Sequence, residues 1–486
     1  MAFSFLLLLG AAFFIGSTWV LLRRSRRNIL LQRLHASGRR VSGARTPPRS
    51  LSPEKKPEIT PEVDYSTSFP PSRRSALAEV LRDEELDEPG EDWAKDVLQM
   101  EKSYLDAFET SRLPCGISVK EIKALGDFPD YATLSGVPLP APYPEFDIAR
   151  ALPRPYRPFR WPYHQTMSLT KMQPDWWIEL ENTYIERIQQ RKKLYEQHTK
   201  DVLNALPGSD LACKELMEMA LQFLCARYPH YFSLSPDKKS FRNGILGIET
   251  QLDQMHPLNV LLEHVPEDFA IMQRDDKTGR YILRAGVICS ALGWNLGTKM
   301  GRNLAGIHAP IPDYKEKMQF SMDRYFTKKP TEKPIQRGSW GLEISTPLYA
   351  PPDSPLLTHR THQLPPSQLP LSDVHLRVDW QTLRRLPLSG AVVFNFKALF
   401  TPVEQFRDEK GVPGLLLRVL EEGKPNLMEY KGTWHVEHVV KPALREWHEE
   451  QVKKGWVKGD WREAETLEES PWFEGWEGKW RGMQGF

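Results

Sequence analysis

Residues 265–314 read VPEDFAIMQRDDKTGRYILRAGVICSALGWNLGTKMGRNLAGIHAPIPDY and carry the most structural information in the chain. Two short apolar runs, FAIMQRD and GRYILRAGVIC, are separated by a polar turn at residues 275–279. Such a pattern is typical of a β-hairpin. Further runs with strand character follow at GSWGLEIS, HLRVDWQTL and GAVVFNFKALF. We therefore expect a mostly antiparallel sheet.

Helical periodicity lies on both sides of these strands. Leu180, Tyr184 and Ile188 recur every four residues, which predicts a helix over residues 175–206 that ends at Pro207-Gly208. Second and third helices are expected at residues 209–227 and 432–453. Helices followed by antiparallel strands with further helices between them indicate an α+β fold.

The segment GIHAPIPDY holds one histidine, His308, in a stiff setting. Pro310 and Pro312 fix φ and remove two backbone donors. Such a segment suits a side chain that must hold a fixed direction, for example an axial metal ligand. The alternative is a histidine that is hydrogen-bonded for structural reasons.

The strand around HLRVDWQTL places Arg377, Asp379 and Gln381 on one side, and Val378 and Trp380 on the other. Polar side chains on a buried strand need partners. A polar pocket or the carboxylate of a prosthetic group would supply such partners. The alternative is a strand edge whose polar side chains face solvent and need no partner within the protein.

Three segments together resemble the haem-dependent oxidative N-demethylase family: residues 265–314, MDRYF at 322–326 and RVDWQTLRRLPLSGAVVF at 377–394. The resemblance covers about residues 160–430. It implies a PAS-like α+β domain around a b-type haem, which oxidises an N-methyl amine with dioxygen and releases formaldehyde. Electrons are expected from NADPH through a separate flavin and iron–sulfur partner protein.

The resemblance also implies roles for individual residues. His308 matches the motif histidine and becomes the candidate axial ligand, and Arg337 is the catalytic candidate, in a distal or propionate position. Gln381, Arg384 and Arg385 match a motif that we expect to bind the cofactor. Asp379, Ser339 and Pro266 depart from the family pattern, so the amine stays open. The alternatives are a non-catalytic haem-binding or ligand-binding PAS-like sensor or carrier, and a domain that kept the fold but lost haem.

The N-terminal sequence predicts a membrane anchor. Residues 2–22 carry no charge and would span roughly 30 Å as a helix, and four arginines follow within residues 23–27. Charge after the apolar run favours an uncleaved anchor over a cleaved signal peptide, with the bulk of the chain in the cytosol. We therefore expect a single-pass membrane protein, located in the endoplasmic reticulum or in the mitochondrial outer membrane.

Charge and composition define the remaining segments. The chain has 65 Lys and Arg against 63 Asp and Glu, which argues against nucleic acid as a partner. We expect an anchor at 2–22, a disordered basic tether at 23–79, a partly helical, proline-rich extension at 80–158, the haem domain at 159–430, and a helix with a tail at 431–486. Seven of the 15 tryptophans lie in that last segment. They are expected to pin the tail to the domain or to offer a partner surface.

Overall fold

The structure is a computed structural model that describes residues 68–81, 96–161, 168–358, 366, 368–460 and 465–485. Residues 57–486 form one compact unit, and residues 1–56 form another that lies outside the described ranges. The description below concerns the larger unit. Near its start lie three short helices, α3 (Ser72–Ala78), α4 (Val119–Leu125) and α5 (Tyr131–Ser135).

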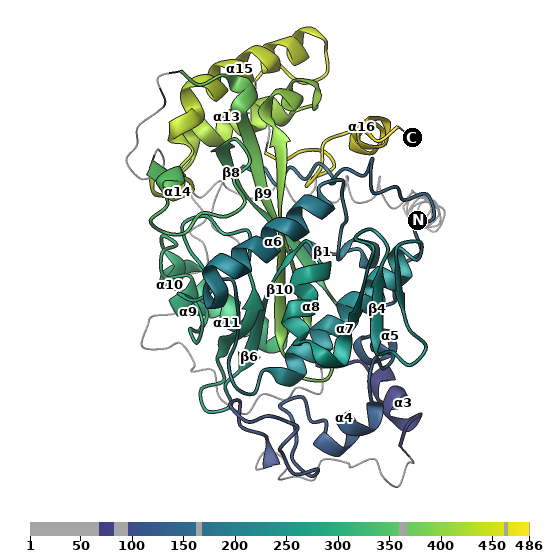
Figure 1. Cartoon of the computed structure of the whole chain (residues 1–486). Coiled ribbons are helices and arrows are strands. Elements are labelled where there is room, and N and C mark those ends of the chain that lie inside the picture. The colour runs from purple at the N-terminus through teal and green to yellow at the C-terminus, as the bar shows by residue number, and fades with distance from the viewer. Residues whose placement is uncertain are drawn as a thin grey trace, which may run out of the picture. The chain divides into compact units, whose positions relative to one another are not determined.

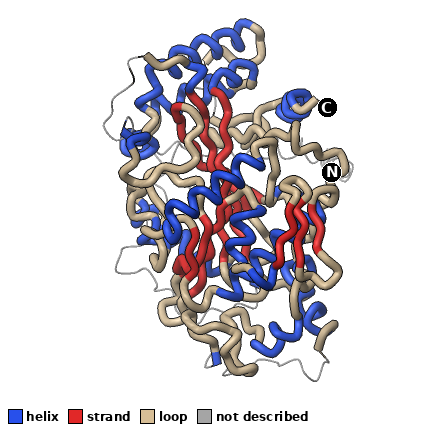
Figure 2. Tube along the Cα trace, viewed as in Figure 1, coloured by secondary structure: helices blue, strands red, loops and turns tan. Residues whose placement is uncertain are grey.

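A seven-stranded antiparallel sheet forms the centre of the described part (Figure 1; Figure 2). Its strands lie in the order β1, β8, β9, β10, β6, β7, β2. Their bounds are β1 (Thr170–Lys171), β2 (Leu203–Ala205), β6 (Asp268–Arg274), β7 (Tyr281–Val287), β8 (Ile335–Ile344), β9 (Val374–Arg385) and β10 (Val392–Pro402). The predicted hairpin is confirmed as β6 and β7, and the three further predicted strands as β8, β9 and β10.

Register fixes which side chains share a face of this sheet. Arg337 of β8 lies opposite Gln381 of β9, which lies opposite Phe396 of β10. Because side chains alternate along a strand, these three point to the same side. We call this side the His308 face, for the histidine described below. The other side, which carries Ile271 and Val393, is called the helical face.

The helical face is covered by α6 (Tyr184–His198), α7 (Asp210–Arg227) and α8 (Pro257–His264), which cross in front of the sheet in Figure 1. Tyr184 and Ile188 of α6 pack in one core with Leu216 of α7 and with Ile271 and Val393 of the sheet. A separate three-stranded sheet, β3 (Phe232–Leu234), β4 (Ser240–Asn243) and β5 (Ile248–Gln251), lies beside these helices.

The His308 face is covered by the segment that follows β7. It contains α9 (Leu304–Ile307), α10 (Tyr314–Lys317) and α11 (Gln319–Lys328). Leu304, Tyr314 and Phe326 from these helices share a core with Leu383 and Phe396 of the sheet. The long β strands continue beyond this core into a third one, formed with α13 (Val412–Glu422), α14 (Pro425–Lys431) and α15 (Trp434–Lys453).

The C-terminal tryptophans pack onto the domain. Trp472 stacks on Trp476 with ring centroids 5.1 Å apart, and Trp476 begins the last helix, α16 (Trp476–Met483). Trp472 also meets Trp176 edge-on at 5.3 Å. The indole N–H of Trp480 donates to the Leu152 carbonyl at 2.8 Å. The tail is therefore fixed to the extended segment that leads into the domain.

The membrane part of the sequence-based prediction was wrong in the light of this fold. None of the helices in the described ranges is long and apolar enough to cross a bilayer. The predicted anchor at residues 2–22 and the tether up to residue 67 lie outside those ranges. The fold class is α+β with a large antiparallel sheet. We withdraw the preceding transmembrane helix, the membrane as a partner, and the single-pass location in the endoplasmic reticulum or mitochondrial outer membrane.

The long helix predicted over residues 175–206 is also corrected. It divides into a 3-10 turn at Pro174–Trp176, an extended piece, α6, and the short strand β2. Tertiary contacts hold the extended piece, because the Glu179 amide donates to Glu267 at 2.9 Å and the Leu180 amide to the Tyr228 hydroxyl at 3.4 Å. Long-range partners therefore override the local helical periodicity.

Candidate functional site

The candidate site begins where the chain leaves the edge of β7. The Gly301 amide donates to the Leu283 carbonyl at 2.9 Å, and the Leu283 amide donates to Arg302 at 3.0 Å. Asn303 then caps α9, since its side chain accepts the Gly306 amide at 2.9 Å. This cap fits the preference of asparagine for helix N-termini. The short helix ends at Ile307, and His308 is its C-cap residue.

Two hydrogen bonds to one carbonyl orient His308. Its backbone amide donates to the Leu304 carbonyl at 3.1 Å, and its ring Nδ1 lies 2.7 Å from the same oxygen. A carbonyl can only accept, so Nδ1 carries a proton and donates it. In the neutral ring the lone pair is then on Nε2, which is the nitrogen left for a metal or another acceptor role.

The surroundings of His308 favour its neutral form. Burial is the largest cause that lowers its pKa below the usual value, and the positive charges of Arg337 and Lys299 lower the pKa further. The hydrogen bond to Leu304 opposes these effects in part. A neutral imidazole is the form that binds metal ions. Lys299 is itself held by the Ile307 carbonyl, to which its ammonium donates at 3.0 Å.

Half-buried apolar side chains lie at the margin of the core that this segment forms with the sheet. They include Phe394 of β10, Trp294 in the loop after β7, and Ile307 of α9. Trp294 meets Phe396 with ring centroids 6.3 Å apart. Arg337 and Gln381 are neighbours in register on this same face and are both half-buried. An apolar wall with a few polar groups is the usual lining of a site for a small molecule or prosthetic group.

The structure brings together three of the five predicted site residues: His308, Arg337 and Gln381. Arg337 and Gln381 share a face of the sheet, and the charge of Arg337 acts on the His308 ring. Arg384 points to the helical face, where its guanidinium lies 4.1 Å from the Trp177 ring centroid. Burial there lowers the pKa of Arg384 to about 10.

Arg385 is on the correct side of the strand, but its donors bind other groups. Its nitrogens donate to the carbonyls of Lys329 at 2.6 Å and Gly390 at 2.8 Å, to the Tyr281 hydroxyl at 2.8 Å, and to the Phe326 carbonyl. This geometry ties β9 to the end of α11. It leaves little donor capacity for a cofactor carboxylate.

The polar row on β9 finds its partners within the protein. Arg377 donates to the Ser290 carbonyl at 2.6 Å, to the Pro347 carbonyl at 2.9 Å and to Asp379 at 3.0 Å. Arg377 therefore anchors two loops at one end of the His308 face. Gln381 has a half-buried side chain, in keeping with the alternative in which part of this row meets a pocket.

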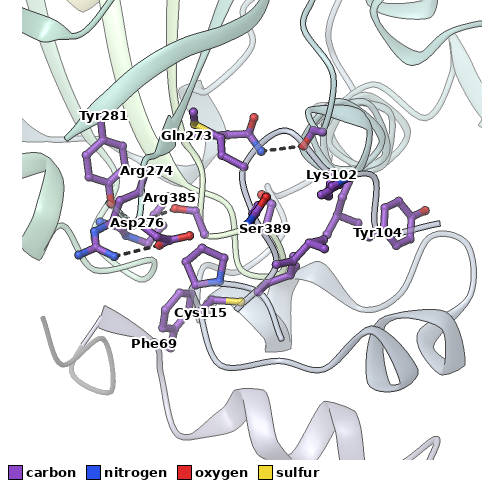
Figure 3. A pocket seen from close by; sticks show the side chains of 18 residues that line it. Phe69, Lys102, Tyr104, Cys115, Gln273, Arg274, Asp276, Tyr281, Arg385 and Ser389 are labelled. Carbon is purple, nitrogen blue, oxygen red and sulfur yellow. Dashed lines mark hydrogen bonds and ion pairs between the residues drawn. The ribbon is translucent and has the colours of Figure 1, made fainter. Parts of the chain in front are cut away.

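Two cavities lie away from His308. One of about 40 Å³ is lined by Arg385, Tyr281, Cys115 and Gln273, and beside it Arg274 pairs with Asp276 at 3.1 Å (Figure 3). A second cavity, of about 260 Å³, lies between α16 and the lead-in segment. Neither is lined by His308, Arg337 or Gln381. In the described part of the chain, no three His, Cys, Asp or Glu side chains converge on a possible metal position.

Sequence reasoning missed two contributors to the geometry at His308. Tyr314 stacks on its ring, and the Leu304 carbonyl fixes its tautomer. The carbonyl could have been expected, because it lies four residues before a histidine at a helix end. The stack has no comparable signal, since it depends on how the chain turns through the two prolines.

The fold and the site define a class of protein. It is an α+β domain in which a neutral, oriented histidine lies near Arg337, whose side chain is half-buried on a face of the large sheet. Residues 168–441, more than half of the 486-residue chain, match the family described as haem-dependent oxidative N-demethylase, alpha subunit-like. The chain therefore belongs to this family. Its description supports a haem cofactor and a haem-dependent oxidation of the N-demethylase type.

Proposed function

We propose that the chain is a haem-dependent oxidoreductase of the monooxygenase type that removes a methyl group from an amine nitrogen and releases formaldehyde. His308 would hold the iron of haem b through Nε2, with Arg337 and Gln381 beside the bound group. The haem would supply dioxygen activation. Electrons would come from NADPH through a separate flavin and iron–sulfur partner protein.

One observation carries this proposal, namely the state of the His308 ring. Nδ1 donates to a backbone carbonyl at 2.7 Å, and such a hydrogen bond fixes the tautomer of metal-binding histidines. Burial and two nearby cations keep the ring neutral. The residues present therefore fit a single axial bond from Nε2.

The remaining residues of the site suit binding and orientation. The positive charge of Arg337 would attract a carboxylate of the haem or hold a polar group of the substrate. Gln381 offers both a donor and an acceptor next to it. Phe394 and Trp294 are half-buried apolar groups that would exclude water from the bound ligands. These roles rest on position. Arg337, Gln381 and Phe394 share the face of the sheet that carries Phe396, and Trp294 in the loop after β7 meets the Phe396 ring.

A spectrum of the purified full chain tests cofactor binding. After expression with added haem, we expect a Soret band that His308→Ala abolishes. His256→Ala is the control, because His256 is an exposed histidine at the start of α8, and its ring accepts the Leu258 amide at 3.2 Å. The control is expected to keep the band. A wild-type protein that is folded but binds no haem would refute the proposal.

Formaldehyde release tests the reaction. The haem-loaded protein, with NADPH and a surrogate flavin and iron–sulfur reductase, is expected to release formaldehyde from an N-methylated amine. Arg337→Met should lower that rate while His256→Ala should not. Haem binding without formaldehyde from any member of a panel of N-methylated amines would favour the non-catalytic sensor or carrier.

A further inference from the structure

The ring of Tyr314 lies against the ring of His308. The two ring centroids are 5.0 Å apart and the planes differ by only 8°. Tyr314 is buried in the core that covers the His308 face, together with Leu304. The imidazole is therefore bounded by an aromatic plane, in addition to its hydrogen bond to the Leu304 carbonyl.

These two contacts restrict different motions of the imidazole. The hydrogen bond from Nδ1 holds one edge of the ring near Leu304. The parallel tyrosine ring opposes rotation about the bond between Cβ and the imidazole, a torsion that is otherwise broad for histidine. With both in place, the direction of Nε2 is defined before any ligand arrives.

Tyr314 is itself held firmly. It begins α10, and its carbonyl accepts the Met318 amide at 2.9 Å. The preceding residue, Asp313, has φ of +56°, and its carboxylate accepts from Lys317 at 2.8 Å and from Lys424 at 2.7 Å. Lys424 immediately precedes α14, so a distant part of the chain braces the turn that places Tyr314.

The ring of Tyr314 contacts His308, whereas its hydroxyl does not contribute. Within the described residues, the buried hydroxyl has no hydrogen-bond partner. Packing of the ring is thus the contact through which this side chain can act. Phenylalanine would preserve that contact, and methionine would fill similar space without a planar ring.

We propose that Tyr314 is a positioning residue that sets the rotational orientation of His308, and hence of an axial bond from Nε2. This inference rests on the proposed function, in which Nε2 binds haem iron. Groups that orient a metal ligand typically change metal affinity or activity about 10- to 100-fold when they are removed. The effect of losing the ring should therefore be visible in the bound cofactor itself.

The experiment compares Tyr314→Phe and Tyr314→Met in the haem-loaded full chain. The first readout is the electron paramagnetic resonance spectrum of the ferric cyanide adduct, which responds to the plane of the axial imidazole. The second is the rate of haem transfer to excess apomyoglobin. The Phe variant should match the wild type in both. The Met variant should give broadened or multiple signals and lose haem about 10- to 100-fold faster.

Tyr281→Met serves as the matched control, because Tyr281 is a buried tyrosine of the same core that meets Phe326 rather than His308. It should lower the unfolding temperature and leave the spectrum unchanged. If the Phe variant changes as much as the Met variant, or neither changes, the inference is wrong while the proposed function stands. The spectrum of the wild type is a test that does not require the Met variant to fold. We expect one narrow electron paramagnetic resonance signal, and several signals, from several imidazole orientations, would overturn the inference. A wild type without haem would instead overturn the proposed function.

Discussion

His308 and Arg385 are both oriented by backbone carbonyls, with opposite consequences for ligand binding. One carbonyl fixes His308 and leaves Nε2 available. Several carbonyls and a hydroxyl occupy the guanidinium of Arg385. Both residues were candidates for cofactor binding from the sequence. They differ in the atoms that remain for a cofactor: His308 keeps Nε2, whereas the donors of Arg385 are used within the protein. The difference lies in the acceptors that tertiary structure places around each side chain.

Arg385→Lys should destabilise the fold and leave the site at His308 intact. Lysine keeps the charge but cannot reproduce a planar fork with contacts to Lys329, Gly390 and Tyr281. Hydrogen bonds to charged groups contribute about 1.5–3 kcal/mol each, so we expect a loss of roughly 2–4 kcal/mol in the free energy of unfolding. Urea unfolding measures this loss. A stable variant with a changed haem spectrum would instead indicate a cofactor-binding role.

Glu215 should make stability depend on pH. It is fully buried on α7 and accepts the Leu388 amide at 2.5 Å and the Ser389 hydroxyl at 2.6 Å. Burial raises its pKa from 4.5 to about 7, against these hydrogen bonds, and the nearby charge of Glu218 raises it further. The folded state therefore keeps a proton that the unfolded chain releases. The stabilisation is complete below pH 4.5 and decreases by about 3 kcal/mol as the pH rises through 7.

Glu215→Gln tests this pH dependence, because its amide does not ionise and its oxygen can still accept the Leu388 amide. Urea unfolding at several pH values from 4.5 to 7.5 should show a smaller decrease in stability for the variant than for the wild type. Part of the decrease should remain, since burial also raises the pKa of Glu267 to about 7. Identical pH profiles for the two proteins would contradict the assignment.

At the scale of elements, sequence patterns predicted what depends on near neighbours. The helix predicted at 209–227 is α7, the helix predicted at 432–453 is α15, and the hairpin is β6 and β7. These elements have strong periodicity and clear turns. The predicted helix at 175–206 was interrupted because Glu267 and Tyr228, both distant in sequence, bind its first part as an extended chain.

The candidate site could likewise be predicted only in part from the sequence. The rigid segment with two prolines identified His308, and the strand register that brings Arg337 beside Gln381 follows once β8 pairs with β9. The opposite orientation of Arg384 also follows from strand alternation, but only if the buried face is known. The partners of Arg385 could not have been predicted, because they come from the end of α11, from the start of β7 and from the turn after β9.

The C-terminal tail should be held chiefly by its stacked tryptophans. Trp476 is 6% exposed and stacks on Trp472. Trp476→Ala removes aromatic contacts that contribute about 3–5 kcal/mol when a buried tryptophan is lost. Because α16 is a short peripheral helix, the loss should appear as local opening and not as global unfolding. Trypsin should then cleave at Lys479 and Arg481 at least tenfold faster, as followed by mass spectrometry.

Trp456→Ala is the control for the tail, because Trp456 is 40% exposed and lies outside the stack. It should leave cleavage at Lys479 and Arg481 unchanged. Equal cleavage rates in the Trp476 variant and the wild type would show that other contacts hold the tail, such as the hydrogen bond from Trp480 to Leu152.

At the scale of the whole described unit, Glu409 joins segments that are far apart in sequence. Its carboxylate accepts from Arg157 of the lead-in segment at 2.6 and 2.8 Å and from Lys479 of α16 at 3.4 Å. Its backbone carbonyl accepts from Gln451 of α15 at 3.1 Å. Arg157 and Glu409 have side chains that are 1% and 0% exposed. The lead-in, the segment that follows β10 and both C-terminal helices thus meet at one buried ion pair.

This convergence predicts strong coupling between Arg157 and Glu409. Glu409→Leu alone leaves a buried cation without its partner and should cost about 3–5 kcal/mol of unfolding free energy. Arg157→Met alone should cost a similar amount, and the double variant should recover much of the loss, because apolar residues of similar size can replace a buried pair. Urea unfolding of the four proteins gives the coupling energy directly. The exposed pair of Arg407 and Glu450 is the control, for which the same cycle should give little or no coupling. Additive losses at Arg157 and Glu409 would mean that the pair does not connect these segments energetically, and that each side chain acts through its other contacts.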